Sequence, residues 1–248
     1  MAGIPLLLSP GRLLVGLSLL LLANPIQAAS LSVNPVRVSL DGSDSVSSLT
    51  LTNQGQDSVV MQASVNAWSI RGNEEHYEPT EALIVSPPVF EVAPGKSQIV
   101  RVGLRNTEPQ AIEQSFRVFL EQSPVAPGDG DAAEGPLQLQ VMLRLGIPVF
   151  VAPDVATKRE VLWRTERLAD GRLRVVAINE GNAHVKVSRL SLLDGDTFLA
   201  HSEKQHYILP DSRRYWLLDV PTGTSPPYRI KAETNEGELN ATATTLSP

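Results

Sequence analysis

Apolar and polar residues alternate along most of the chain after about residue 30. A period of two residues is typical of β-strands with one buried face, and helical periodicity is nearly absent. Turn-forming residues such as Asp41-Gly42, Asn53-Gln54-Gly55 and Pro94-Gly95 separate the alternating stretches. In the first half of the chain the expected strands are residues 32–40, 46–52, 59–70, 84–85, 89–92, 98–104 and 116–120. Short strands at this spacing predict a β-sandwich.

The pattern restarts after Pro153-Asp154, which marks a domain boundary. The expected strands there are residues 160–164, 173–179, 186–193, 206–209, 215–220, 228–233 and 239–245, with Asx-Gly and Glu-Gly turns between them. We therefore predict an all-β protein with two β-sandwich domains of immunoglobulin-like size, covering residues 29–153 and 154–248.

The longest alternating stretch runs from Leu137 to Val151 and reads LQLQVMLRLGIPVFV. Leu137, Leu139, Val141 and Leu143 fall on one face, while residues 147–151 are apolar on both faces and are expected in this protein's own core. Extended, these residues would reach roughly 50 Å, whereas a usual strand spans about 17–20 Å. Either the whole apolar face packs into the protein's own core, or its first part pairs with another protein by β-augmentation.

Residues 1–28 have the pattern of an export signal. Arg12 is the only charged residue before the apolar run 13–23, and Ala28 offers a small residue for cleavage. The alternative is a retained membrane anchor, but the run is shorter than the roughly 18–20 residues that a spanning helix needs. We predict a cleaved signal peptide over residues 1–28.

Composition narrows the range of functions. The 248 residues carry a net charge of −6, which argues against nucleic acid as a partner. There is no cysteine, so disulfides, thiol catalysis and thiolate metal sites are excluded. The four histidines, at positions 76, 184, 201 and 206, lack metal-ligand spacing, and no nucleophile or phosphate-binding motif occurs. We expect no enzyme activity, no cofactor and no metal site; an exported hydrolase has no residues to support it.

Several motifs together carry a family resemblance. They are residues 35–42 (PVRVSLDG), Ser86-Pro87-Pro88, residues 93–101 (APGKSQIVR), Phe119-Leu120 with Pro124, and the alternating stretch that ends at Pro153. In this order, behind a signal peptide, they resemble the periplasmic chaperones of chaperone–usher pilus assembly. The resemblance covers essentially all of residues 30–248. It implies two immunoglobulin-like domains arranged as an L or boomerang, with a cleft between them.

The resemblance also implies partners and a location. Such a chaperone acts in the periplasm, binds pilin-like subunits whose immunoglobulin fold is incomplete, and delivers them to an outer-membrane usher for assembly into fimbriae at the cell wall. By resemblance, Leu137, Leu139, Val141 and Leu143 form the donor strand that fills the subunit's pockets. Arg37 matches the first of two basic cleft residues that hold the subunit's C-terminal carboxylate, for which a guanidinium offers two parallel hydrogen bonds.

The second basic residue is where this chain departs from the family. The family's lysine position is filled by Pro148, which cannot bind a carboxylate. Arg144 lies on the same face, about 13 Å away along an extended strand, and is the candidate substitute. This departure suggests a divergent branch of the family, of which the archaic one is a candidate.

A pilin or adhesive immunoglobulin-like surface subunit is the alternative function. Pilins lack one strand of their sheet, whereas this chain has two sandwiches that look complete in the pattern. The donor strand also offers an edge through which the free form could self-associate.

Overall fold

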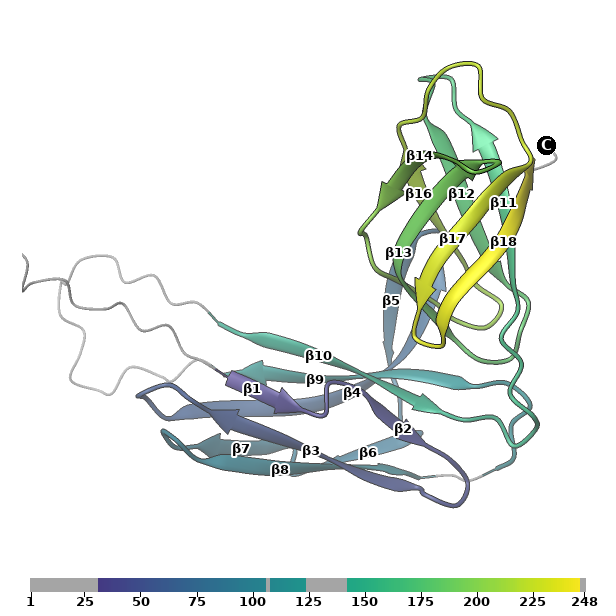
Figure 1. Ribbon diagram of the computed structural model, residues 1–248. Helices are drawn as coiled ribbons and strands as arrows, with labels where there is room; N and C mark the ends of the chain where they lie inside the picture. Colours follow the sequence, from purple (N-terminus) through teal and green to yellow (C-terminus); the bar gives the residue numbers. More distant parts are fainter. Residues whose placement is uncertain (1–30, 106–107, 124–141, 246–248) are drawn as a thin grey trace, which may run out of the picture.

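A computed structural model describes residues 31–105, 108–123 and 142–245. These residues form β-strands and no helix, and they build two domains that meet as the arms of an L (Figure 1). The prediction of an all-β protein with two sandwich domains is confirmed. Within the part of the chain that the structure describes, no helix is long and apolar enough to cross a membrane.

Two sheets form the N-terminal domain. The smaller sheet has the order β1-β3-β8-β6, and the larger has the order β2-β10-β9-β4-β5, with β7 also paired to β4. The strands are β1 (Leu31–Asn34), β2 (Val38–Leu40), β3 (Val46–Asn53), β4 (Val59–Arg71), β5 (Glu74–Pro79), β6 (Leu83–Ser86), β7 (Val89–Val92), β8 (Ser97–Leu104), β9 (Gln114–Gln122) and β10 (Arg144–Val151). Alternate residues of both sheets, among them Leu49, Val100 and Val118, are fully buried between them.

The single strand expected over residues 32–40 is wrong. β1 pairs with β3 in the smaller sheet, whereas β2 pairs in parallel with β10 in the larger one. The chain therefore crosses from one sheet to the other, and Pro35, Val36 and Arg37 lie in the crossing without strand pairing. This crossing places Arg37 at the end of the sheet that faces the C-terminal domain.

The second half of β10 belongs to the protein's own interior, as predicted. Ile147, Val149 and Val151 join the N-terminal core. Phe150 points to the other face, where it packs with Trp68 and Leu209 in a small cluster at the domain junction. One strand thus contributes to the domain core with one face and to the junction with the other.

The C-terminal domain is built from strands in the order β14-β13-β17-β18-β11-β12-β16, with β15 also paired to β13. They are β11 (Val161–Arg167), β12 (Leu173–Asn179), β13 (Val185–Asp194), β14 (Thr197–Ser202), β15 (His206–Ile208), β16 (Arg213–Leu218), β17 (Tyr228–Thr234) and β18 (Gly237–Thr245). Trp163, Trp216 and Tyr228 are its largest fully buried side chains. Since β18 pairs with both β17 and β11, it joins the two layers of this sandwich.

The tip of the β4–β5 hairpin contacts the C-terminal domain. Gly72 has a φ of +66° in the two-residue turn at the tip, a conformation that glycine adopts without strain. The neighbouring Asn73 accepts a hydrogen bond from the backbone N–H of Tyr215 at 3.0 Å and donates one to its carbonyl at 3.4 Å. An asparagine side chain therefore pairs with β16, which is an edge strand of the C-terminal domain.

Candidate functional site: an interdomain cleft beside the free edge of β10

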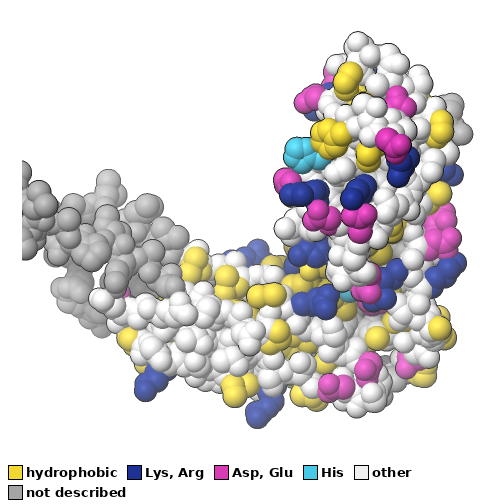
Figure 2. Space-filling model, in the orientation of Figure 1, with side chains coloured by type: hydrophobic (Ala, Val, Ile, Leu, Met, Phe, Trp, Pro, Cys, Tyr) yellow, Lys and Arg dark blue, Asp and Glu magenta, His cyan; other side chains and the backbone are white. Residues whose placement is uncertain are grey.

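A cleft of about 620 Å³ lies between the two domains. Residues from both domains line it: Pro35, Val36, Arg37, Arg117, Pro148, Lys186, Ser188, Tyr207, Thr234 and Asn235. Three of these side chains are cationic and none is acidic. Figure 2 shows Lys and Arg side chains gathered in the angle between the domains, and hydrophobic side chains along the adjoining face of the N-terminal domain. The cleft is suited to an anionic group carried by an apolar segment.

Arg37, which the family resemblance assigned to a cleft, is exposed at this one; its role as a carboxylate ligand stays a prediction. It follows the chain crossing between β1 and β2, and within the described ranges its guanidinium has no hydrogen-bond or ion-pair partner. The neighbouring Val36 is 76% exposed. An exposed valine next to an unpaired arginine presents an apolar contact and a charge on the same short segment.

Pro148 accounts for the absence of strand pairing at this segment. The backbone N–H of Ala152 donates to the carbonyl of Leu40 at 2.8 Å, in the parallel ladder that starts at Val149 and Val38. With the two-residue repeat of such a ladder, residue 148 would donate to residue 36. Proline has no N–H, so this bond cannot form and the ladder stops short of Arg37.

β10 has a free edge next to the cleft. It pairs with β9 along its whole described length, but with β2 only over Val149 to Val151. Between Arg144 and Pro148, its other edge has no strand partner among the described residues. A hollow of about 310 Å³ runs along this edge and is lined by Leu31, Val33, Val36, Arg144, Leu145, Gly146 and Ile147. The edge and its apolar hollow lead toward the cleft.

Of the predicted donor residues, Leu137, Leu139 and Val141 lie outside the described residues. Leu143 is partly buried just before β10, and its carbonyl accepts a hydrogen bond from the Gln122 N–H at 2.9 Å. The role of all four residues stays a prediction.

Arg144 does not line the cleft. Its Nε lies 2.5 Å from Glu121 Oε1, and its guanidinium carbon lies 3.9 Å from the centre of the Phe119 ring. The structure therefore brings Arg144 to the hollow beside β10 and not together with Arg37. Its role as a carboxylate ligand stays a prediction.

Arg117 is a cleft residue that the sequence reasoning missed. It lies on β9 directly opposite Pro148, so a cation from the adjacent strand fills the space beside the proline. Its side chain is 11% exposed, its guanidinium carbon lies 4.0 Å from the centre of the Trp68 ring, and its Nη2 lies 3.0 Å from Glu75 Oε2. The sequence offered one signal for this residue, which is that an arginine interrupts the otherwise apolar residues 116–120.

Glu75 links this cleft cation to the C-terminal domain. Its Oε1 accepts a hydrogen bond from Arg214 Nη2 at 2.9 Å, while its Oε2 pairs with Arg117. The Arg214 side chain is only 2% exposed, and it also donates to the carbonyls of Tyr207 and Asn73 at 3.1 and 2.5 Å. Burial lowers the pKa of Arg214, and the nearby Glu75 charge opposes that effect. One carboxylate thus pairs with a cation from each domain, and the three groups together keep a net positive charge.

Tyr207 and Lys186 are the principal contributions of the C-terminal domain to the cleft. They lie opposite each other on β15 and β13, with Lys186 Nζ 5.5 Å from the centre of the Tyr207 ring. Burial raises the pKa of the Tyr207 hydroxyl, and the positive charges of Arg117 and Arg37 oppose that rise. The electrostatic influence of both arginines therefore extends to the Tyr207 ring beside Lys186.

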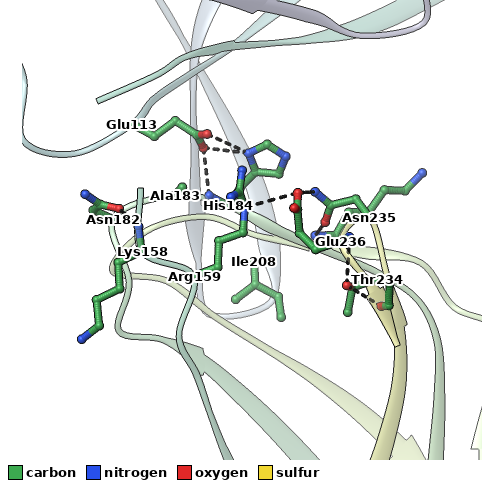
Figure 3. Close-up of polar contacts among 12 residues, drawn as sticks. Glu113, Lys158, Arg159, Asn182, Ala183, His184, Ile208, Thr234, Asn235 and Glu236 are labelled. Atoms are coloured by element: carbon green, nitrogen blue, oxygen red, sulfur yellow. Dashed lines mark hydrogen bonds and ion pairs between the residues drawn. The ribbon is translucent and has the colours of Figure 1, made fainter. Parts of the chain in front are cut away.

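A buried contact between Glu113 and His184 joins the two domains. The Glu113 carboxylate accepts a hydrogen bond from the His184 backbone N–H at 2.9 Å, and its two oxygens lie 2.8 and 2.9 Å from His184 Nδ1 (Figure 3). The imidazole stacks on Phe150 with the ring centres 3.6 Å apart. Both polar side chains are 5% exposed. Neither polar residue lines the cleft, so this contact joins the two domains without forming part of the cleft surface.

Comparison with known proteins agrees with this architecture. Residues 30–156 match the family described as "Pili and flagellar-assembly chaperone, PapD N-terminal domain". The chain is 30% identical over 166 residues to the chaperone protein FimB/FhaD of Bordetella pertussis, a match that covers 59% of this chain and 65% of that relative.

Among the solved structures that share the fold are two chaperone–subunit complexes. One is the CsuC–CsuE chaperone–tip subunit pre-assembly complex from archaic Csu pili of Acinetobacter baumannii, with a TM-score of 0.65, 18% identity, and coverage of 88% of this chain and 100% of that chain. The other is the Salmonella enterica SafA pilin in complex with the SafB chaperone, with a TM-score of 0.60, 16% identity, and coverage of 87% and 97%. On the family match and this shared two-domain fold, the chain belongs to the pilus-assembly chaperones with a PapD-type N-terminal domain.

Proposed function

We propose that this protein is a periplasmic chaperone that binds pilin-like subunits by donor-strand complementation and delivers them to an outer-membrane usher. The observation that carries the proposal is the free edge of β10 from Arg144 to Pro148, which leads into a cleft lined by cations. A strand added to this edge would gain backbone hydrogen bonds and would end beside Arg37. The proposal includes non-enzymatic action, delivery to an usher and a periplasmic location. These parts are supported by the family and by the predicted export signal.

The donor residues would supply most of the affinity. Each apolar side chain buried in a subunit pocket contributes about 1.5–3 kcal/mol, whereas a backbone hydrogen bond contributes a net 0.5–1.5 kcal/mol. Leu137, Leu139, Val141 and Leu143 precede β10 on the face that continues into the N-terminal core. In this proposal the four residues are buried in the core of the subunit, as Ile147, Val149 and Val151 are buried in the core of the N-terminal domain. The backbone pairing sets which donor residue faces which pocket.

Arg37 would bind the C-terminal carboxylate of the subunit. Its guanidinium is exposed and has no partner among the described residues, so its hydrogen bonds are available to a ligand. A charge-assisted, bidentate pair with a carboxylate would fix where the subunit chain ends and therefore which residues face each pocket. This role makes Arg37 a register anchor as well as a source of affinity.

Co-purification from the periplasm tests the proposal. The wild-type chain, carrying a tag, is expected to retain a pilin-like subunit produced in the same cells. Changing Leu139, Val141 and Leu143 together to serine should abolish that retention without unfolding the protein. As a matched control, Phe198→Ser removes an apolar side chain that is 57% exposed on β14 and should leave retention unchanged. Full retention by the triple variant would disprove donor-strand binding.

A second pair of variants tests the anchor. Arg37→Ala should weaken subunit retention severely, because the carboxylate would lose its bidentate partner. Arg101→Ala removes an exposed arginine on β8 that does not line the cleft, and it should have no effect. Equal retention by both variants would leave Arg37 without a role in binding.

A further inference from the structure

The charge balance of the cleft singles out one residue of the C-terminal domain. Of the three cleft cations, Arg117 already has an ion-pair partner in Glu75 at 3.0 Å, which it shares with Arg214. Arg37 and Lys186 have no carboxylate partner within the part of the chain that the structure describes. An arriving anion therefore meets two cations that have no ion-pair partner among the described residues, one from each domain.

We propose that Lys186 is the second ligand of the subunit's C-terminal carboxylate, so that the carboxylate is clamped between the two domains by Arg37 and Lys186. The inference rests on the proposed chaperone function and names a residue of the same site. In this arrangement the C-terminal domain supplies the second positive charge. The N-terminal domain cannot supply it, because Pro148 fills the family's lysine position.

The local structure holds Lys186 in position for this role. Its backbone N–H donates to Asn235 Oδ1 at 2.7 Å, and its carbonyl accepts from the Asn235 N–H at 3.1 Å. Its ammonium group lies 5.5 Å from the centre of the Tyr207 ring, on the wall of the cleft. The residue as a whole is half-buried, which limits the rotamers of its side chain and lowers the entropic cost of binding.

The ring contacts at the junction connect the two sides of the clamp. Tyr207 lies 5.2 Å from Trp68 in an edge-on contact, and Trp68 lies under the Arg117 guanidinium. Packed aromatic rings therefore connect Lys186 of the C-terminal domain to Arg117 of the N-terminal domain. A change in the angle between the domains would move Lys186 relative to Arg37, so carboxylate binding should depend on the domain junction as well as on the sheet edge.

The test uses the subunit that co-purifies with the wild-type chain, in its native form and with two glycines added after its last residue. The extension moves the carboxylate away from its site while keeping the strand. Each tagged chaperone variant competes with untagged wild type for a limiting amount of subunit. With the native subunit, Lys186→Met should bind at least about tenfold less, which corresponds to one hydrogen bond to a charged group. Lys186→Arg should keep most of the binding.

With the extended subunit, Lys186→Met and wild type should bind equally, because the charge that Lys186 pairs with has been moved. Lys204→Met removes an exposed lysine of the same domain that does not line the cleft, and it should match wild type in both assays. Unchanged binding of the native subunit by Lys186→Met would overturn the clamp, and so would an equal loss with both subunit forms. If wild type itself retains no subunit, the chaperone proposal fails together with the clamp.

Discussion

Glu75 offers the sharpest test of how the domains are held together. It lies on β5 and accepts hydrogen bonds from Arg117 at one oxygen and from Arg214 at the other. Glu75→Gln keeps the shape of the side chain and removes its charge. The buried Arg214 would then keep its bonds to two backbone carbonyls but would lose its only carboxylate partner among the described residues.

The expected cost follows from burial. Breaking a fully buried ion pair by removing one partner costs about 3–5 kcal/mol. Because the Glu75 side chain is 34% exposed, solvent screens part of the interaction, and we expect a loss of about 2 kcal/mol in the free energy of unfolding. Glu78→Gln is the matched control. This residue lies on the same strand and pairs with Arg71, but the two side chains are 62% and 65% exposed, so the loss should stay below about 1 kcal/mol.

Urea unfolding followed by tryptophan fluorescence measures both changes. Trp68 lies at the domain junction, so its fluorescence reports on the contacts between the domains. Trp163 and Trp216 lie in the core of the C-terminal domain, to which Arg214 belongs, and report on the unfolding of that domain. If the two glutamine variants differ by less than about 0.5 kcal/mol, the Glu75 bridge does not stabilise the junction and the reasoning from burial is refuted.

Two further predictions concern the C-terminal domain. Gly181→Ala should destabilise this domain by about 1–3 kcal/mol in thermal unfolding, because a Cβ there would overlap the carbonyl oxygen of Lys158 and lie 2.8 Å from the Glu160 nitrogen; an unchanged melting temperature would contradict this. Burial, aided by the positive charges of Arg214 and Lys204, lowers the pKa of His206 to about 4, whereas an unfolded histidine titrates near 6.5. Since the unfolded chain binds the extra proton between these values, stability should fall as the pH drops from about 6.5 to about 4, by on the order of 3 kcal/mol. His206→Phe should remove this part of the pH dependence, and identical profiles for wild type and variant would exclude His206 as its source.

Strands with a clear alternation could be predicted from the sequence almost to the residue. Val89–Val92 and Leu173–Asn179 agree with the expected ranges, because each presents one apolar face to a core. β5 was missed because its sequence, EEHYEP, has little apolar pattern to read. Its stability comes from pairing with β4 and from charged contacts to the other domain, and neither leaves a local signal.

The site could be predicted only where it depends on a single segment. Arg37 was found through the family resemblance of residues 35–42 (PVRVSLDG), and the structure places it at the cleft. Arg117 and Lys186 reach the same cleft from a neighbouring strand and from the other domain. Their positions depend on strand register and on the domain junction, neither of which periodicity reveals.

Backbone hydrogen exchange tests the central claim most directly, since strand addition must protect amides of the donor segment. We predict that, in the complex with the co-purified subunit, alternate amides between Leu137 and Leu143 exchange far more slowly than in the free protein, because they form backbone hydrogen bonds with the subunit. Equal exchange of these amides in the free protein and in a stable complex would contradict donor-strand complementation.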